Sequence, residues 1–555
     1  MAEMITIYLD DTATQYSIPS GCSLLEIAQI IALDSDPLAA YVNNRMREMT
    51  HRVYTDSTIR FADATSFSGV RVYQRTIWLV LQHVIEQLYP SQKLYIRHSM
   101  GVNGFYCEVE GKESFLCDEI DNIRNAMREV VDSNVPIMRQ RLRTEDVRQI
   151  YAERGYIDKI QLLNTRPRLF REIYRLNETV GYFYGSLAPS TRYVQIFEVQ
   201  SYYKGFYLSL PKRDKPLNVS VSPHQEKMFN IFKEYQHWVD IMGVPTVGAL
   251  NAQILAGDGS ELIKVAEALH EKKIIALAEI LVIANERYNT RIALLSGPSS
   301  SGKTSTAKRL GVQLRVMGYS PVLISLDDYF VDREKTPLDE NGEYDFEALE
   351  AIDIELFNSD LKRLLAGESV DIPRYDFVSG ERRKHDKPLQ LTDNSIVVIE
   401  GIHGLNPNLT PSLPADSLFR IYVSCFTTVA MDNTTRIATS DNRLLRRLTR
   451  DFRTRGNSGL STLARWASVR RGEERHIFPY QENADVMFNS SLFYEISVLR
   501  RYVEPILHDV PNTSVEYDDA CRLLKFLDNF IPINPSEIPP TSLLREFIGG
   551  SSFKY

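Results

Sequence analysis

Short apolar runs alternate with helical periodicity in the second half of the chain. Residues 292–295 form an apolar run as long as a buried strand, and residues 305–317 repeat apolar side chains at helical spacing. Two further apolar runs of strand length lie at residues 322–326 and 396–399. Buried strands that alternate with helices are typical of a doubly wound, mostly parallel α/β sheet, so we predict this fold for the region.

The first 65 residues show a different pattern. Residues 4–9 alternate between polar and apolar positions like a strand, and residues 15–18 continue as a hairpin partner after a turn. Ser23 is placed to cap a helix, and two more short strands are expected near residues 39–43 and 58–61. The order strand, strand, helix, strand, strand predicts a β-grasp domain.

The rest of the chain divides by further changes of pattern. At 555 residues it is too long for one hydrophobic core. An apolar helix at 73–88 opens an α+β region, helical stretches at 224–242 and 261–287 form a connector, and the tail has a helix at 520–530 before a proline-rich stretch. We therefore expect a multidomain α/β protein with units at 1–65, 66–222, 223–288, 289–510 and 511–555.

Composition and charge narrow the class of protein. The net charge of −8 argues against a globally basic nucleic-acid binder, although local basic patches remain open. The five cysteines are scattered and form no CxxC pair, which indicates reduced thiols rather than zinc or redox chemistry. The N-terminus lacks the features of a signal peptide and no apolar stretch reaches 18 residues, so we expect a cytoplasmic protein without membrane contact. The sequence leaves the oligomeric state open, a homo-oligomer included.

Residues 297–304, Gly-Pro-Ser-Ser-Ser-Gly-Lys-Thr, form a complete GxxxxGK(S/T) phosphate-binding loop between the predicted strand and helix. Glycines at its two ends let the backbone turn its N–H groups toward phosphate oxygens at the positive end of the helix. The alternative is a simple glycine turn before a helix. We predict ATP binding by Gly297, Pro298, Ser299, Ser300, Ser301, Gly302, Lys303, Thr304 and Ser305.

Two carboxylates follow the other predicted strands of this sheet. Asp327 stands after the strand at 322–326, where ligand sites of doubly wound sheets form, and it could accept a hydroxyl proton. Glu400 ends the strand at 396–399 and is placed to hold Mg²⁺ together with the Thr304 hydroxyl. The alternative is that both are solvated charges at strand ends.

An arginine-rich stretch lies between Asp441 and Arg475. We expect Arg447, Arg450 and Arg455 to close over the transferring phosphoryl group as a helical lid. A patch for RNA and a plain solvated helix are the alternatives, and the lack of regularly interleaved aromatic residues disfavours a nucleic-acid groove. The stretch contains Arg443, Arg446, Arg447, Arg450, Arg453, Arg455, Arg465, Arg470, Arg471 and Arg475.

The motifs of residues 290–505 resemble those of the uridine kinase and phosphoribulokinase superfamily, and uridine kinases most closely. The resemblance is carried by GPSSSGKTS, LDDYF, YDFEALEAID, RYDFVSGER, VIEGIHGL and RRLTRDFRTRG. It implies an ATP- and Mg²⁺-dependent kinase. The acid that matches Asp327 is the general base and lies near the metal, and the acid that matches Asp345 binds the ribose hydroxyls. The resemblance further assigns Tyr375 and Phe377 to the nucleobase, and Arg447, Arg450 and Arg455 to ribose and phosphates.

Two positions depart from the uridine kinase pattern. A histidine that usually contacts the pyrimidine is replaced by Gly380, and a lid arginine is replaced by Asn457. Because a site that loses a base-specific hydrogen bond also loses discrimination, the departures leave the preferred nucleoside open.

The N-terminal region resembles that of threonyl-tRNA synthetases up to about residue 213. The β-grasp part is similar to their TGS domain, and the long helix followed by NGFYCEV is similar to their editing-associated domain. In that domain an HxxxH pair and a CxxxH pair bind metal. Here Arg75 and Leu79 stand at the first pair and Phe183 and Leu187 at the second, so editing is not expected. A scaffold role and retained binding of RNA or a small molecule both stay open.

These observations predict a nucleoside kinase that uses ATP and Mg²⁺, with Asp327 as base and Lys303 on the phosphates. One alternative is an RNA- or ligand-binding regulator whose kinase half acts as a switch. Another is a kinase for a sugar phosphate or other small alcohol.

Overall fold

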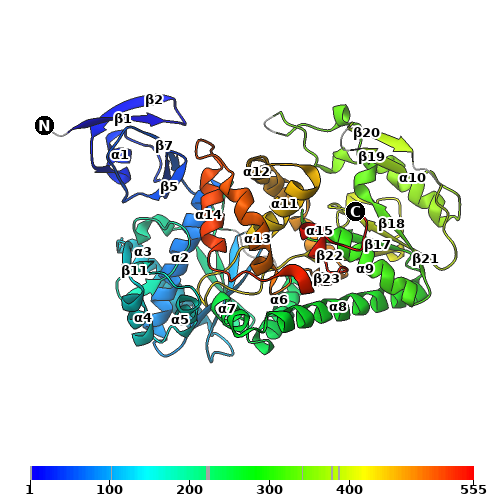
Figure 1. The fold of residues 1–555 in the computed structure, drawn as a ribbon, viewed down its shortest axis with the longest axis horizontal. Helices are drawn as coiled ribbons and strands as arrows, with labels where there is room; N and C mark the ends of the chain where they lie inside the picture. The colour runs from blue at the N-terminus through cyan, green and yellow to red at the C-terminus, as the bar shows by residue number, and fades with distance from the viewer. Residues whose placement is uncertain (1–2, 102, 220–224, 340–341, 377–378, 385–387) are drawn as a thin grey trace.

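The computed structural model describes residues 3–101, 103–219, 225–339, 342–376, 379–384 and 388–555. In Figure 1 the N-terminal sheet lies at one end of the molecule and the phosphate-loop sheet at the other, and the long helix α8 runs along the lower edge toward that sheet. The chain ends beside α9 and β17, in the half opposite its start.

The first unit is a five-stranded sheet of order β2-β1-β7-β4-β5 that packs on one helix. Its β1–β7 pair is parallel, and Ile5, Ile7 and Leu9 of β1 point into the core, as their alternation predicts. Ser23 caps the helix as expected, because its Oγ accepts a hydrogen bond from the Glu26 N–H at 3.2 Å. The elements are β1 (Met4–Leu9), β2 (Thr14–Pro19), β3 (Cys22–Ser23), α1 (Leu24–Ile30), β4 (Ala39–Val42), β5 (Arg45–Glu48), β6 (Arg52–Val53) and β7 (Ser57–Ala62).

The second unit combines a four-stranded sheet, β13-β14-β9-β8, with a three-stranded one, β10-β11-β12. Its first helix begins six residues before the expected start, because Ser66 caps it by accepting from the Gly69 N–H at 3.0 Å. The elements are α2 (Phe67–Leu88), β8 (Leu94–Met100), β9 (Gly104–Val109), α3 (Cys117–Asp132), β10 (Met138–Arg143), α4 (Thr144–Glu153), α5 (Ile157–Asn164), β11 (Phe170–Leu176), β12 (Thr179–Gly181), β13 (Glu198–Tyr202), β14 (Gly205–Ser209), β15 (Pro211–Lys212) and β16 (Lys215–Val219).

Three helices connect this unit to the phosphate-loop sheet. They are α6 (Glu226–Ile241), α7 (Val247–Ala256) and α8 (Gly259–Tyr288), of which α7 is not expected from the sequence. Phe229 and Phe232 are buried at 5% and 3% exposure and belong to the core. The expected boundary at 222/223 lies within residues 220–224, outside the described part of the chain.

The phosphate-loop sheet has five parallel strands in the order β18-β21-β17-β22-β23. The expected strands at 292–295, 322–326 and 396–399 are confirmed as β17, β18 and β21. The elements are β17 (Ile292–Ser296), α9 (Lys303–Val316), β18 (Ser320–Ser325), α10 (Ile354–Leu365), β19 (Pro373–Asp376), β20 (Glu381–Lys384), β21 (Ser395–Glu400), β22 (Leu418–Ser424), α11 (Thr439–Arg455), α12 (Gly459–His476), β23 (Val486–Asn489) and α13 (Glu495–His508).

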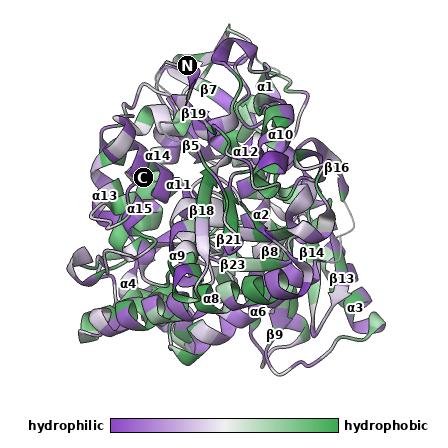
Figure 2. Ribbon diagram, turned by 90° about the vertical axis from the view of Figure 1, so that its right-hand side faces the viewer, coloured by the Kyte–Doolittle hydropathy of each residue, from purple (hydrophilic) through white to green (hydrophobic). Residues whose placement is uncertain are grey.

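Both faces of this sheet are covered by helices, as the doubly wound prediction requires. Alternate residues of β17 point to opposite sides: Ala293 and Leu295 join the core with α8 and α9, whereas Ile292 and Leu294 join the core with α10. Figure 2 shows that the strands at the centre, β21 among them, are mostly hydrophobic. A continuous apolar strand is the pattern expected of a parallel sheet buried on both faces.

The tail belongs to the same core as the phosphate-loop sheet. Its helices are α14 (Tyr517–Leu527) and α15 (Arg545–Ile548). Phe526, Leu543 and Phe547 are fully buried among residues of α8, α11 and α13. The tail therefore packs against this half of the molecule, and no pattern in the sequence predicts α15.

A buried ion pair ties the second unit to the phosphate-loop half. Lys159 Nζ of α5 lies 2.8 Å from Asp432 Oδ1, and the two side chains are 3% and 0% exposed. Removing one partner of such a pair leaves an uncompensated buried charge, which costs about 3–5 kcal/mol.

We predict that Lys159→Met lowers the thermal unfolding midpoint of the full chain by several degrees. Adding Asp432→Asn should recover part of the loss, because the second substitution removes the stranded charge. Scanning calorimetry of the two variants makes the comparison. An unchanged midpoint for Lys159→Met, or equal losses in the single and double variants, would contradict this role.

Candidate active site

The phosphate loop, residues 297–304, has the backbone that its glycines predict. A Cβ at Gly297 would lie 1.9 Å from the Val423 carbonyl oxygen of β22, so only glycine fits there. Gly302 has a φ of 87°, in the left-handed region that favours glycine, and it stands directly before α9. The loop therefore connects strand to helix with the turn that an anion-binding site needs.

Two buried arginines of α11 hold the carbonyl groups of this loop. Arg443 Nη1 donates to the Ser299 oxygen at 3.1 Å, and Arg446 Nη1 donates to the Ser300 and Ser301 oxygens at 3.4 Å. Both side chains are almost completely buried, at 1% and 0% exposure. The arginine stretch is thus not a plain solvated helix, and these two members lie too deep to form an RNA patch.

Each of these arginines is neutralised by a buried glutamate. Arg443 pairs with Glu473 of α12, and Arg446 Nε donates to Glu495 Oε2 of α13 at 2.9 Å. Glu473 also accepts from the Ser299 N–H at 3.2 Å. The sequence analysis assigns no role to these residues. Arg443 and Arg446 lie three residues apart, on one helical face, and this spacing was the available signal.

The side chains predicted to bind phosphate and metal come together at the ends of three strands. Lys303 Nζ donates to the oxygens of Gly297 and Pro298 at 3.0 and 3.3 Å, so its ammonium lies over the loop. Thr304 Oγ1 donates to Glu400 Oε1 at 3.2 Å. Ser325 at the end of β18 donates to the same oxygen at 3.2 Å. Hydroxyl and carboxylate oxygens of this kind are the ligands that Mg²⁺ prefers.

Removal from water shifts the pKa values of the acids around the loop. It raises the pKa of Asp327 in η2 (Leu326–Tyr329), against the opposing charges of Lys303, Arg455 and Arg450. Desolvation raises the pKa of Glu400 to about 7, with Lys303 opposing the shift and Asp327 adding to it. A raised pKa makes a carboxylate a stronger proton acceptor near neutral pH.

A further acid near the loop is missed by the sequence analysis. Desolvation and the charge of Glu473 raise the pKa of Glu347 to about 7, while Arg447 and Lys303 oppose the rise. Glu347 lies two residues after Asp345, inside the YDFEALEAID motif, and its proximity to the loop is a tertiary effect.

The three predicted lid arginines gather around one buried acid. Arg447 Nη1 donates to Ser299 Oγ at 2.8 Å, in direct contact with the loop. Asp451, at 2% exposure, pairs with Arg447, Arg450 and Arg455 at 3.3, 2.9 and 3.5 Å. The lid helix ends at Gly456, whose φ is 65°. Arg447 thus contacts the loop, and the charges of Arg450 and Arg455 act on Asp327.

Asp345 and Tyr375, which are expected to hold the acceptor, lie in the described part of the chain. Asp345 Oδ1 accepts from the Glu347 N–H at 3.0 Å. Tyr375 of β19 is 5% exposed, and its N–H donates to Asp328 Oδ1 at 3.2 Å. Phe377 lies outside the described residues.

Gly380, which replaces the family histidine, has a φ of 76°. A Cβ at this position would lie 2.9 Å from Arg333 Cζ. The Arg333 side chain thus lies against Gly380, where a larger side chain would meet it.

The C-terminal segment, residues 535–555, reaches the phosphate loop from outside. Glu546 Oε2 of α15 accepts from both the N–H and the Oγ of Ser305, at 3.2 and 2.6 Å. Tyr555 Oη lies 2.8 Å from the same Oγ. A Cβ on Gly302 would lie 2.7 Å from Leu543 Cδ2. No sequence motif marks these residues, which lie about 240 positions after the loop.

The four positions that stand for the synthetase metal ligands also converge. Leu79, Phe183 and Leu187 are buried in one apolar cluster at 1% exposure or less, and Arg75 Nε donates to the Ser186 oxygen at 2.9 Å. Three apolar side chains and a guanidinium offer no ligand for zinc. Across the described residues, no group of three His, Cys, Asp or Glu side chains has the arrangement of a metal site.

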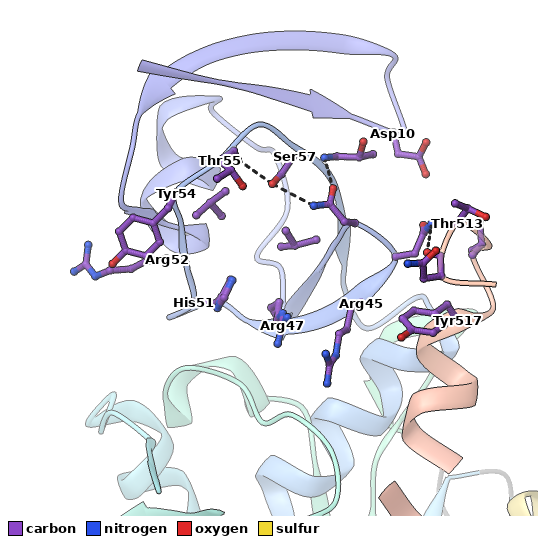
Figure 3. Close-up of a pocket in the computed structure, with 17 residues that line it drawn as sticks. Asp10, Arg45, Arg47, His51, Arg52, Tyr54, Thr55, Ser57, Thr513 and Tyr517 are labelled. Carbon is purple, nitrogen blue, oxygen red and sulfur yellow. Dashed lines mark hydrogen bonds between the residues drawn. The ribbon is translucent and has the colours of Figure 1, made fainter. Parts of the chain in front are cut away.

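The N-terminal sheet carries a hollow of about 840 Å³ that lies apart from the phosphate loop. Figure 3 shows Arg45 and Arg47 of β5 at its border, with Tyr517 of α14 beside Arg45. Arg45 and Tyr54 are exposed, so this hollow is an open surface. Separately, no helix in the described ranges is both long and apolar enough to cross a bilayer.

Comparison with known proteins agrees with the geometry of the phosphate-loop half. Residues 292–496 match the Phosphoribulokinase / Uridine kinase family. A uridine kinase of Staphylococcus aureus is 30% identical over 199 residues, which are 36% of this chain and 86% of the relative. The solved structure of a possible uridine kinase from Bacillus stearothermophilus is 21% identical, covers 36% of this chain and 88% of that one, and has a TM-score of 0.25.

The N-terminal region has relatives of another kind. A threonine–tRNA ligase of Syntrophomonas wolfei is 27% identical over 201 residues, which are 36% of this chain and 31% of the ligase. The chain thus spans about a third of that relative. The phosphate loop, the strand-end acids and these matches together show that the chain is a member of the phosphoribulokinase and uridine kinase family, joined to a region similar to the N-terminal part of a threonine–tRNA ligase.

Proposed function

We propose that the protein is an ATP- and Mg²⁺-dependent kinase that phosphorylates the 5′-hydroxyl of a nucleoside. The observation that carries the proposal is the grouping of Asp327, Lys303 and Glu400 at the phosphate loop. The charges of all three act on one another, and Thr304 contacts Glu400 at 3.2 Å. A base, a phosphate-binding cation and a metal ligand are the parts that phosphoryl transfer needs.

In the proposed reaction Asp327 accepts the proton of the 5′-hydroxyl, and the hydroxyl oxygen bonds to the γ-phosphorus while the bond from that phosphorus to ADP breaks. Lys303 exchanges its two carbonyl partners for phosphate oxygens. Thr304 and Glu400 would hold Mg²⁺, which when bound would neutralise phosphate charge. Arg447 and Arg450 add positive charge from the lid. Positioning and charge neutralisation supply most of the rate enhancement.

Tyr375 and Asp345 support a nucleoside, whose ring and ribose hydroxyls match an aromatic side chain and a carboxylate. ADP release measured with each of several nucleosides, sugar phosphates and small alcohols distinguishes the acceptor classes. Stimulation by alcohols alone would replace the nucleoside with the small-alcohol alternative.

We predict that Asp327→Asn lowers kcat at least about a hundredfold, because a positioned general base contributes roughly 10²–10⁴ in rate. The dissociation constant for ATP should change by less than about threefold, since the phosphate loop is intact. The matched control is Asp393→Asn, at the exposed far end of β21. A coupled assay of ADP release and a calorimetric titration give the two quantities. Full activity of Asp327→Asn would exclude it as the base.

Binding of Mg²⁺ should depend on pH through Glu400. Because desolvation raises the pKa of Glu400 to about 7, the carboxylate is mostly protonated at pH 6 and mostly ionised at pH 8. Only the ionised form binds the cation well. The apparent affinity for Mg²⁺, titrated calorimetrically with ADP present, should therefore rise about tenfold from pH 6 to pH 8.

The control for this pH dependence is Glu400→Gln, which should bind Mg²⁺ weakly at every pH in the range. A wild-type affinity that stays constant from pH 6 to pH 8 would contradict the assignment of Glu400.

The C-terminal segment should compete with the nucleotide. Glu546 occupies the Ser305 N–H, at the positive end of α9, where a phosphate would be favoured. Because a charge-assisted hydrogen bond contributes about 1.5–3 kcal/mol, Glu546→Gln should lower the dissociation constant for ATP about tenfold. The control is Glu537→Gln, on the same segment but bonded to Ser260. Calorimetry measures both, and weaker or unchanged ATP binding in Glu546→Gln would contradict the competition.

A further inference from the structure

A cavity of about 520 Å³ lies between the synthetase-like region and the lid helices. Arg75 and Trp78 of α2 form one wall, and Arg443, Trp466 and Arg470 of α11 and α12 form the opposite wall. Of the predicted phosphate-loop residues only Pro298 touches it, and neither Asp327 nor Glu400 does. The cavity is therefore distinct from the proposed active site but lies directly behind its lid.

Arg75 is a buried cation in this wall without a countercharge. It is 7% exposed, and its Nε donates to the Ser186 oxygen. Among the described residues no carboxylate oxygen lies within 4.0 Å of its guanidinium. Burial lowers the pKa of Arg75 to about 10, and the nearby charges of Arg71 and Arg522 contribute to the shift. Native proteins rarely bury a charge alone, because the loss of hydration costs several kcal/mol.

A second buried cation lines the same cavity. Arg436 is 5% exposed, and its guanidinium donates to the backbone oxygens of Arg97 and Thr427. In the described parts of the chain it too has no carboxylate within 4.0 Å. Burial lowers the pKa of Arg436 to about 9. Two buried guanidinium groups without a carboxylate partner in the described ranges line the same cavity, and together they indicate an anion-binding site more strongly than either does alone.

The indole N–H of Trp78 is a third buried hydrogen-bond donor in the cavity wall. The indole N–H of Trp78 is buried, with the side chain 6% exposed, and has no hydrogen-bond partner among the described residues. Indole and guanidinium groups donate hydrogen bonds and cannot accept them. A ligand that accepts hydrogen bonds from these donors must therefore be rich in acceptor oxygens and negatively charged.

Basic residues outnumber acidic residues in the lining of the cavity. It contains ten arginine or lysine residues and four aspartate or glutamate residues. Several of these arginines are paired, as Arg522 is with Asp441 at 2.7 Å, whereas Arg75 and Arg436 have no carboxylate partner among the described residues. Trp78, Trp466 and Phe478 add aromatic surface. Convergent polar groups in a largely apolar cavity of this volume are typical of small-molecule sites.

We propose that this cavity is a second binding site, which takes a phosphorylated ligand of nucleotide size, with Arg75 and Arg436 on the phosphate and an aromatic wall against the ring. The site is coupled to the phosphate loop through Glu473. That residue pairs with Arg443 and Arg470 of the cavity wall and accepts from the Ser299 N–H of the loop. Ligand binding behind the lid therefore acts on the groups that shape the loop.

The test measures binding rather than turnover, and it uses the full chain with Lys303→Ala to weaken the phosphate loop. Thermal unfolding is followed with inorganic phosphate and with nucleoside mono-, di- and triphosphates. A nucleoside phosphate should raise the unfolding midpoint, since a ligand that binds only the folded chain stabilises it. Two of the three tryptophans line the cavity, so the same ligand should change the intrinsic fluorescence.

Arg75→Met and Arg436→Met, each added to this background, should abolish the shift while leaving the midpoint without ligand unchanged or higher, because a buried unpaired charge is removed. The control is Arg128→Gln, an exposed arginine of α3. Persistence of the full shift in both variants would overturn the proposal. So would the absence of any shift with the nucleoside phosphates, or a shift with an RNA oligonucleotide only. Failure of the nucleoside kinase assignment would leave these binding results unaffected.

Discussion

The phosphate loop depends on two buried arginine–glutamate pairs, Arg443–Glu473 and Arg446–Glu495. Each guanidinium divides its N–H donors between a carboxylate and the loop carbonyls, so the carbonyls are held on the side of the lid helix. Isolated charges would be too costly at this depth, and the glutamates make the arrangement stable. Helix α11 supplies both of these arginines and also Arg447 and Arg450. The same helix therefore holds the loop and forms the lid.

The sheet and the loop could be predicted because local sequence determines them. A parallel strand buried on both faces must be apolar throughout, as residues 292–295 are, and Gly297 is needed where the backbone passes Val423. The features that the sequence did not predict depend on tertiary contacts. Glu546 reaches the loop from a helix of four residues near the chain end. Burial of Arg443 and Arg446 depends on contacts with α12 and α13, which no local sequence pattern predicts.

The N-terminal half and the kinase half share a hydrophobic core, so they are joined by more than a linker. Helices α6 to α8, the five-stranded parallel sheet and the tail contribute to one hydrophobic core. Lys159 and Asp432 add a buried ion pair across the junction. In the synthetase-like region, Arg75 lines the cavity behind the lid, and among the described residues no carboxylate oxygen lies within 4.0 Å of its guanidinium. The fusion therefore places a cationic cavity beside the phosphate loop, whose Pro298 forms part of the lining.

The central claim is that this site transfers the γ-phosphoryl group of ATP to a nucleoside 5′-oxygen. The most direct measurement is phosphorus-31 NMR of the products that the full chain forms from ATP, Mg²⁺ and a panel of nucleosides. Our account predicts a phosphate monoester resonance coupled to the ribose 5′ protons, formed in equal amount with ADP. ADP accompanied only by inorganic phosphate, or a monoester on an acceptor that is not a nucleoside, would contradict it.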